Sequence, residues 1–398
     1  MRRNLDFAQW LAGLLLVPAL AWGSAAWAAD APDAATDFDA RMQGLMREGG
    51  LVGAGAAILV GPEVRWLQGY GWADREQGIA FTPDTVMNIA SISKTVTGVA
   101  LLQAVEAGRL DLDRDVNDYL PFRLVNPHAP GGVVTLRHLA THTSGITDRP
   151  AVYARGYVFG RDPEQALGSF LAGYLVPGGA DYDPSNFLAF APGTHRDYSN
   201  IGAALAGYIV ERATGQRLDE WTRQHVFQPL RMERSAWWLS QVPRHARLYV
   251  VAEGMAVPIL PYGLVTYPDG GVRTSVADLS RFFAALLGGG EYEGARILSP
   301  RMTAEMRRFQ YVGASTPGNV DPAKLNSGIF WSTKLEGALV GHGGSDPGLE
   351  TVMLYDPKAD VGVVLFTNTA PDDAGMKAFI AMVQLLRERG LQLKAQAR

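Results

Sequence analysis

The stretch Ser91-Ile92-Ser93-Lys94 opens a helical pattern that continues to Gly108. Because one turn of a helix takes between three and four residues, we expect the Ser91 hydroxyl and the Lys94 amine on the same helix face. A serine hydroxyl is a weak nucleophile that needs a neighbouring base. A lysine can be that base where apolar surroundings disfavour its charge. The flanking residues supply such surroundings: Ile89, Ala90, Ile92, Val96 and Val99.

Ser91 is therefore a candidate nucleophile and Lys94 a candidate base. At the start of a helix the backbone N–H of Ser91 would also be unpaired, and it could bind a developing oxyanion. Taken alone, the pair is more often a helix-capping serine followed by a lysine exposed to solvent.

A second motif, Tyr198-Ser199-Asn200, lies between a Pro-Gly turn and the start of another helix. A tyrosine in this place can carry a proton to and from Ser91, and the Asn200 amide can bind a substrate carbonyl. The structural alternative is that Asn200 caps the helix and Tyr198 packs in the interior.

A third motif, Gly341-His342-Gly343-Gly344-Ser345, follows the short apolar run Ala338-Leu339-Val340. Glycines on an edge strand let a substrate backbone approach closely, and the N–H of Ser345 could complete an oxyanion hole. The structural alternative is a tight turn with a histidine that faces solvent.

The hydrophobic pattern runs from strands to helices and back to strands. Apolar runs at 56–60 and 64–70 flank Gly61-Pro62, which predicts a hairpin. We predict an α/β (α+β) fold in which 38–90 and 225–390 form an antiparallel β-sheet flanked by helices. Residues 91–224 would form an inserted, mainly helical domain, with the active site between the two.

Three segments lie outside this core. Residues 1–28 have two arginines, an apolar run shorter than the roughly 20 residues that span a bilayer, and Ala26-Trp27-Ala28. They predict a secretory signal peptide, and hence a periplasmic or extracellular protein with a membrane link only if the leader stays uncleaved. Residues 29–37 and 391–398 are predicted to be flexible tails.

The composition limits the partners. The net charge of −4 gives no basic surface for nucleic acid, and the absence of cysteine excludes disulfides. His138 and His142 have the spacing of a zinc pair, but a third ligand and a catalytic glutamate are missing. No phosphate-binding or dinucleotide-binding glycine loop is present. We therefore expect no metal and no cofactor, and a small molecule or peptide as substrate; the oligomeric state stays open.

The ordered series Ser-x-x-Lys, Tyr-x-Asn and His-x-Gly resembles the serine β-lactamase and penicillin-binding DD-peptidase superfamily. The tyrosine makes it similar to the class C β-lactamase branch, which includes family VIII carboxylesterases and D-aminopeptidases. The resemblance runs from about Phe38 to Leu386, and three further stretches support it: residues 138–146, 270–275 and 344–348.

The resemblance implies a mechanism. Ser91 would form an acyl-enzyme that water releases, with Lys94 and Tyr198 as base and acid. The N–H groups of Ser91 and Ser345 would bind the oxyanion. The substrate would be oriented by four residues: Asn200, His342, Gly343 and Gly344.

One departure bears on the substrate. Many members of the superfamily have lysine where this chain has His342, and a histidine is mostly neutral at pH 7. Arg273 could replace the missing cation, but the sequence does not place it. We therefore expect a serine hydrolase that acts on esters or small amides. Two alternatives stay open: a DD-carboxypeptidase or D-aminopeptidase, and a non-catalytic protein that binds peptidoglycan or a partner. Whether residues 149–194, a long loop-rich stretch, form a mobile lid also stays open.

Overall fold

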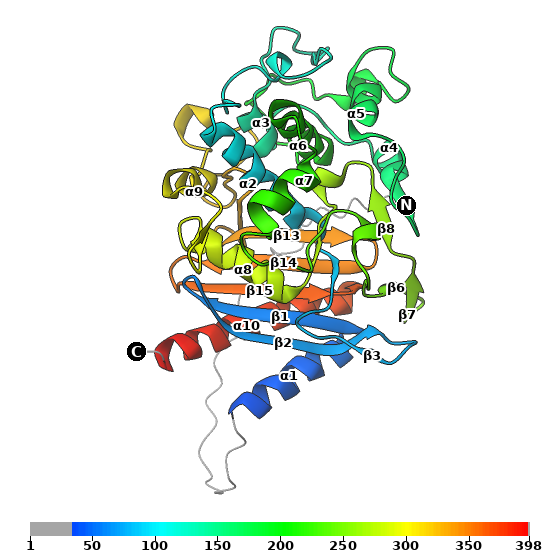
Figure 1. Cartoon of the computed structure of the whole chain (residues 1–398), viewed down its shortest axis with the longest axis vertical. Coiled ribbons are helices and arrows are strands. Elements are labelled where there is room, and N and C mark those ends of the chain that lie inside the picture. Colours follow the sequence, from blue (N-terminus) through cyan, green and yellow to red (C-terminus); the bar gives the residue numbers. More distant parts are fainter. Residues whose placement is uncertain (1–33, 397–398) are drawn as a thin grey trace, which may run out of the picture.

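The computed structural model describes residues 34–396 and has a seven-stranded antiparallel sheet with helices on both faces (Figure 1). The order of strands is β12-β13-β14-β15-β1-β2-β3. Strands from the two ends of the chain therefore lie side by side. Their bounds are β1 (Gly53–Val60), β2 (Glu63–Asp74), β3 (Ile79–Ala80), β12 (Ser332–Lys334), β13 (Leu339–Asp346), β14 (Leu349–Asp356) and β15 (Val361–Thr367).

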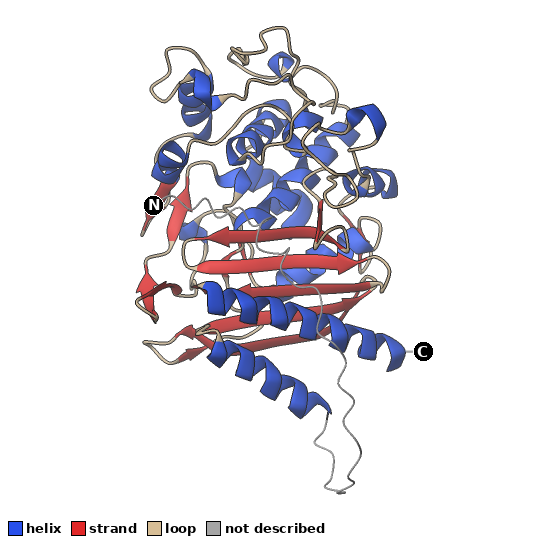
Figure 2. Ribbon diagram, turned by 180° about the vertical axis from the view of Figure 1, so that it is seen from behind, coloured by secondary structure: helices blue, strands red, loops and turns tan. Residues whose placement is uncertain are grey.

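The outer face of the sheet is covered by α1 (Ala34–Glu48) and α10 (Asp373–Gln396), which cross it side by side in the view from behind (Figure 2). Central strands β14 and β15 are buried throughout because both of their faces are covered. The outer core consists of apolar side chains from the helices and the sheet, among them Phe38, Met42, Leu365, Phe379, Met382 and Leu386. A hydrogen bond from Val52 N to Thr369 Oγ1, across 317 residues of sequence, ties the first strand to the last part of the chain.

The inner face packs against α8 (Val276–Leu287), and a helical layer lies above it (Figure 1). In that layer α2 packs against both α6 and α9. The remaining helices are α2 (Ser93–Glu106), α3 (Leu136–Ala140), α4 (Pro150–Tyr153), α5 (Leu167–Leu175), α6 (Asn200–Thr214), α7 (Leu218–Thr222) and α9 (Pro300–Arg307). Among the described residues, no helix is both long enough and apolar enough to cross a membrane.

Several short strands pair outside the main sheet. One of these pairs, β5 with β8, connects the predicted helical segment 91–224 to the predicted sheet segment. The pairs are β4 (Met87–Asn88) with β9 (Arg273–Thr274), β5 (Tyr157–Phe159) with β8 (Tyr262–Leu264), and β10 (Glu291–Tyr292) with β11 (Ala295–Arg296). A three-stranded group contains β6 (Leu248–Ala252), β7 (Met255–Ile259) and β16 (Thr369–Ala370).

The predicted fold class is confirmed, and so is the hairpin of β1 and β2. Two boundaries are wrong. Residues 34–37 belong to α1, where Asp37 in the first turn suits the positive end of the helix dipole. Residues 391–396 belong to α10, where Lys394 Nζ donates to Ala359 O at 2.7 Å. The predicted leader at 1–28 lies outside the described residues, as do 29–33 and 397–398.

Candidate active site

Ser91 lies on a 3₁₀ turn, Ala90–Ile92, that leads from β4 into α2. The helix proper begins at Ser93, so Ser91 comes just before it. Ser91 is half-buried between a buried Ala90 and a buried Ile92. Among the described residues we find no acceptor for the Ser91 N–H. This amide is therefore available to a ligand oxygen, and its role in an oxyanion hole stays a prediction.

The backbone of this turn is strained. Ala90 has φ of +46°, which is uncommon for a residue with a side chain. Hydrogen bonds hold its neighbour on both sides: Ile89 N donates to Val272 O at 3.0 Å, and Thr351 Oγ1 donates to Ile89 O at 3.0 Å. Strain of this kind persists only where surrounding contacts impose it, and it is concentrated at functional sites.

The glycine motif lies on β13 next to this turn. Strand β12 pairs with β13 only at 339–341, so from His342 onward β13 is an open edge. A Cβ on Gly344 would lie 2.5 Å from Ile89 O and 2.9 Å from Ala90 Cβ. Only a glycine therefore lets β13 approach the Ser91 turn this closely. Ser345, the next residue, is exposed.

Lys94 is fully buried, and its ammonium group is surrounded by acceptors. Its Nζ donates to Ser91 Oγ at 3.0 Å, to Asn200 Oδ1 at 2.7 Å and to the carbonyl oxygen of Asp269 at 2.8 Å. Three acceptors match the three N–H bonds of a protonated lysine. The predicted Ser91–Lys94 pair thus meets in space, and the second motif joins it through Asn200.

Tyr198 reaches the same place with its ring. The Lys94 Nζ lies 4.9 Å from the centre of that ring, which is the geometry of a cation–π contact. The ring also packs on His142, at 4.2 Å between centroids. The structure therefore places the phenol beside the amine, without a direct bond to Ser91.

Asp148, which sequence reasoning missed, positions the second motif. Its carboxylate accepts from Ser199 Oγ at 2.8 Å, from Asn200 N at 2.7 Å and from Ile201 N at 3.1 Å. Burial raises the pKa of Asp148. The cap of α6 is Ser199, whose hydroxyl accepts from Gly202 N, so the Asn200 side chain is left for Lys94.

His342 is buried, and its Nδ1 lies 2.6 Å from Gly343 O. Burial, with help from the nearby charges of Lys334 and Lys94, holds the pKa of His342 well below its ordinary value of 6.5. The ring is therefore neutral at pH 7, as predicted from its identity. Gly343 faces the opposite side of the sheet, where it lines a small space beneath α10 with Val352.

Arg273 does not supply a cation to the site. Its guanidinium donates to the carbonyl oxygens of Trp237, Gly271 and Tyr262, and the side chain is buried. It fixes backbone segments around the short strands.

His138 and His142 have separate roles. His138 Nδ1 accepts from Thr135 N at the start of α3, and His142 Nδ1 accepts from Ser199 N at 3.3 Å. Among residues 34–396 there is no group of three or more side chains that could hold a metal ion.

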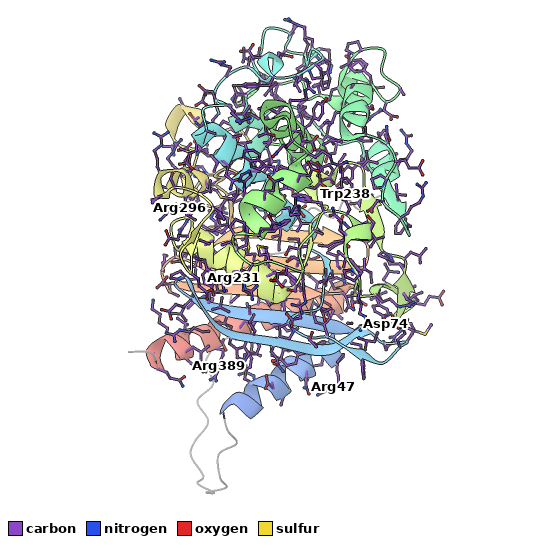
Figure 3. All side chains as sticks on the ribbon, viewed as in Figure 1. Arg47, Asp74, Arg231, Trp238, Arg296 and Arg389 are labelled. Carbon is purple, nitrogen blue, oxygen red and sulfur yellow. The ribbon has the colours of Figure 1, made fainter. Side chains whose placement is uncertain are left out.

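None of the three motifs lines the cavity at the end of β2. A cavity of about 670 Å³ is lined by Asp74, His245 and Leu260, among other residues, and by none of the three motifs. Asp74 marks its position at the end of β2 in Figure 3, well below the helical layer.

Comparison with known proteins adds a family context. The family model named Beta-lactamase matches residues 38–386. Esterase EstB of Burkholderia gladioli is 30% identical over 388 residues, which cover 87% of this chain and 93% of that protein.

Solved structures agree with this match. The octameric penicillin-binding protein homologue from Pyrococcus abyssi has a TM-score of 0.70 at 26% identity, over 89% of this chain and 78% of that one. The D-amino acid amidase from Ochrobactrum anthropi SV3 has a TM-score of 0.68 at 22% identity, over 91% and 99%, which shows a shared fold.

Proposed function

Since this chain belongs to the β-lactamase family and is a serine hydrolase, we propose that Ser91 attacks the carbonyl of an ester or small amide and forms an acyl-enzyme. The observation that carries the proposal is the contact of 3.0 Å between the buried Lys94 Nζ and Ser91 Oγ. A lysine is rarely fully buried unless polar groups pair with its ammonium. Here one of the three groups that pair with Lys94 is the hydroxyl of a candidate nucleophile, Ser91.

The proposed reaction has two halves. In the first, Ser91 Oγ bonds to the carbonyl carbon, the Ser91 proton passes to Tyr198 or Lys94, and the leaving group departs with a proton from the same pair. In the second, water adds to the acyl carbon and gives up a proton to that pair. The bond from the acyl carbon to Ser91 Oγ then breaks, Ser91 Oγ takes a proton back from the pair, and the acid leaves. The N–H groups of Ser91 and Ser345 would bind the oxyanion in both halves.

Two groups that could bind a substrate carboxylate do not offer a cation for it. The ring of His342 is neutral because it is buried, and the guanidinium of Arg273 donates to three carbonyl oxygens. Positive charge is still present beside the site, because Lys334 and Lys94 lie close enough to His342 to lower its pKa. The esterase name of the relative from Burkholderia gladioli supports the ester reading.

The experiment is covalent labelling of purified protein with a fluorescent fluorophosphonate, followed by intact mass measurement. We expect one label on the wild type, none on Ser91→Ala, and a full label on the control Ser240→Ala, which changes an exposed serine. A folded wild type that takes no label would overturn the proposal and favour a binding protein. If the wild type is labelled, a higher turnover of p-nitrophenyl butyrate than of nitrocefin would support the preference for esters.

We also propose that the protein is exported by its N-terminal leader. Ala26-Trp27-Ala28 and the preceding apolar run support this proposal. N-terminal sequencing of the exported protein should begin at Ala29, and retention of Met1 would contradict cleavage.

A further inference from the structure

His142 has no part in the proposed reaction, yet its side chain lies against the tyrosine that is proposed to carry the proton. It follows α3, and it is buried, with 6% of its surface exposed. Its ring packs on the ring of Tyr198 at 4.2 Å between centroids, with 32° between the two planes. The Tyr198 ring is therefore in contact with an imidazole as well as with the Lys94 ammonium.

His142 also holds the main chain on both sides of Tyr198. Its carbonyl oxygen accepts from Asp197 N at 2.9 Å, and its Nδ1 accepts from Ser199 N at 3.3 Å. One residue thus contacts three consecutive residues: the backbone before the tyrosine, the phenol ring, and the backbone after it. The hydrogen bonds of Asp148 go to residues 199–201, so they support the other end of the same motif.

The bond from Ser199 N determines where the His142 ring carries its hydrogen. A ring nitrogen that accepts a hydrogen bond has no hydrogen of its own, so the neutral ring is protonated at Nε2. Burial, together with the positive charges of Arg196 and Lys94, holds the pKa of His142 well below its ordinary value of 6.5. The ring is therefore neutral at pH 7 and keeps Nδ1 as an acceptor.

The surroundings of His142 fix its ring in place. Its φ is +59°, a value that few residues other than glycine adopt, and such strain persists only where neighbouring contacts impose it. His142 N donates to Leu139 O at 3.2 Å, and the ring meets that of the buried Phe330 edge to face at 5.8 Å. Phe330 N donates in turn to Ala140 O at 3.1 Å. A continuous set of contacts therefore leads from α3 through His142 to Tyr198.

Proton transfer depends strongly on the position of the Tyr198 hydroxyl. An acid or base must lie within hydrogen-bond reach of the atom that it serves, and a displacement of about 1 Å can lower a rate by about 10²-fold. A tyrosine held only by its main chain can turn about its Cα–Cβ bond. The His142 ring restricts this rotation because it packs directly on the phenol ring.

We propose that His142 is a positioning residue for Tyr198, which holds the main chain on both sides of this tyrosine and restricts the rotation of its ring. The inference rests on the proposed function, in which Tyr198 exchanges protons with Ser91 and with the leaving group. It predicts that removal of the His142 ring lowers activity through Tyr198, so that the loss disappears when the Tyr198 hydroxyl is absent.

A double-mutant cycle with His142→Asn and Tyr198→Phe tests the inference. Asparagine keeps an acceptor bonded to Cγ, as Nδ1 is, and it tolerates a positive φ, but it has no ring to pack on Tyr198. We expect His142→Asn to slow acylation by p-nitrophenyl butyrate about tenfold in the wild type and less than about twofold in Tyr198→Phe. Equal factors in the two backgrounds would show a role independent of Tyr198 and would overturn the inference.

The leaving group provides a second measurement that a merely structural role would not change. p-Nitrophenolate departs as an anion, whereas the alcohol of an ethyl ester must receive a proton as it departs. His142→Asn should therefore lower kcat/KM for ethyl butyrate by a factor at least about threefold larger than for p-nitrophenyl butyrate. Equal losses for the two esters would contradict a role through the proton donor.

The matched control is His225→Asn. The ring of His225 also packs on an aromatic ring at 4.2 Å between centroids, but that ring belongs to Trp221, whose Nε1 donates to Gln103 in the second half of α2. This variant should leave acylation and the ratio of the two esters unchanged. A loss as large as that of His142→Asn would overturn the assignment to His142.

A second variant covers the case in which His142→Asn does not fold. His142→Gly adopts a φ of +59° without strain, and it should show the same dependence on the Tyr198 hydroxyl. Fluorophosphonate labelling separates the two possible failures. A folded wild type without label would overturn the proposed function, whereas a labelled wild type with equal factors in both backgrounds would overturn only the role of His142.

Discussion

At the scale of single residues, the contacts of Lys94 determine how the proton can move. Its three N–H bonds are all used, one of them toward Ser91 Oγ. An ammonium in this arrangement can accept the serine proton only after it has passed one of its own protons to another group. The phenol of Tyr198, whose ring lies beside this ammonium, is the candidate partner in that exchange.

Tyr198→Phe should therefore lower kcat for p-nitrophenyl butyrate on the order of 10²-fold, because it removes the hydroxyl and leaves the ring on Lys94. Lys94→Ala should lower the same kcat by at least the same factor. Stopped-flow measurement of acylation checks both. Tyr208→Phe is the control, since Tyr208 stacks on Phe122 away from the motifs. Near-normal acylation by Tyr198→Phe would remove this residue from proton transfer.

Sequence reasoning identified Ser91, Lys94 and Asn200, which the structure brings into contact. It could not identify the third partner of Lys94, because the acceptor is the backbone carbonyl of Asp269, and a carbonyl has no signature in a sequence. Asp148 was missed for a different reason. In the sequence, a single aspartate before a loop cannot be told from an exposed surface aspartate. Only the structure shows the three groups that donate to Asp148.

At the scale of secondary-structure elements, the approach of β13 to the Ser91 turn depends on Gly344. Gly344→Ala places a Cβ against Ile89 O, a backbone atom that cannot rotate away. We expect the strand and the turn to separate, with a loss of kcat/KM of roughly tenfold or more because the oxyanion donors move apart.

Kinetics and thermal unfolding of the same samples check this prediction. The control is Gly173→Ala in α5, where a Cβ meets nothing within 4 Å, so stability should rise slightly, by about 0.5–1 kcal/mol. Full activity in Gly344→Ala would contradict the proposed role of this close approach.

Strand β14 contains a carboxyl group that should make stability depend on pH. Glu350 pairs across the sheet with Ser345, and it is fully buried. Burial raises the pKa of Glu350 to about 8 from an ordinary 4.5. Between these values the folded protein keeps a proton that the unfolded chain has released, so the free energy of unfolding falls as pH rises.

Glu350→Gln has no carboxyl group to ionise at this position. Its free energy of unfolding should therefore not show the part of the decrease with pH that Glu350 causes. Relative to wild type, the variant should become more stable between pH 5 and pH 9, as judged by the melting temperature at each pH. Glu63→Gln, an exposed control on β2, should follow the wild-type curve. Parallel curves for wild type and Glu350→Gln would show that Glu350 does not titrate in this range.

Helices and strands could be predicted where a hydrophobic pattern continues over many residues, as in β1, α2 and α6. The ends of α1 and α10 were not, because they depend on a local charge and on a hydrogen bond from Lys394 to a distant carbonyl. The pairing of β5 with β8 was also out of reach, since two three-residue strands give no periodic signal.

At the scale of the whole molecule, α10 is required for the sheet. Its buried face, with Phe379, Met382 and Leu386, covers the outer core. A chain that ends at Pro371 should therefore give no soluble folded protein. A chain that ends at Gly390 should melt within a few degrees of the full chain, because 391–396 is mostly exposed. Soluble yield and circular dichroism check both, and a folded shorter chain would contradict the prediction.

The bond between Val52 and Thr369 closes a loop of 317 residues. Strand β1 acquires its neighbour β15 only after residues 361–367 have been synthesised. Until then the first hairpin has an unpaired edge, and most of its neighbours in the sheet do not yet exist. Folding of the sheet must therefore wait for this distant strand, which gives a chaperone a long period in which to hold the chain open.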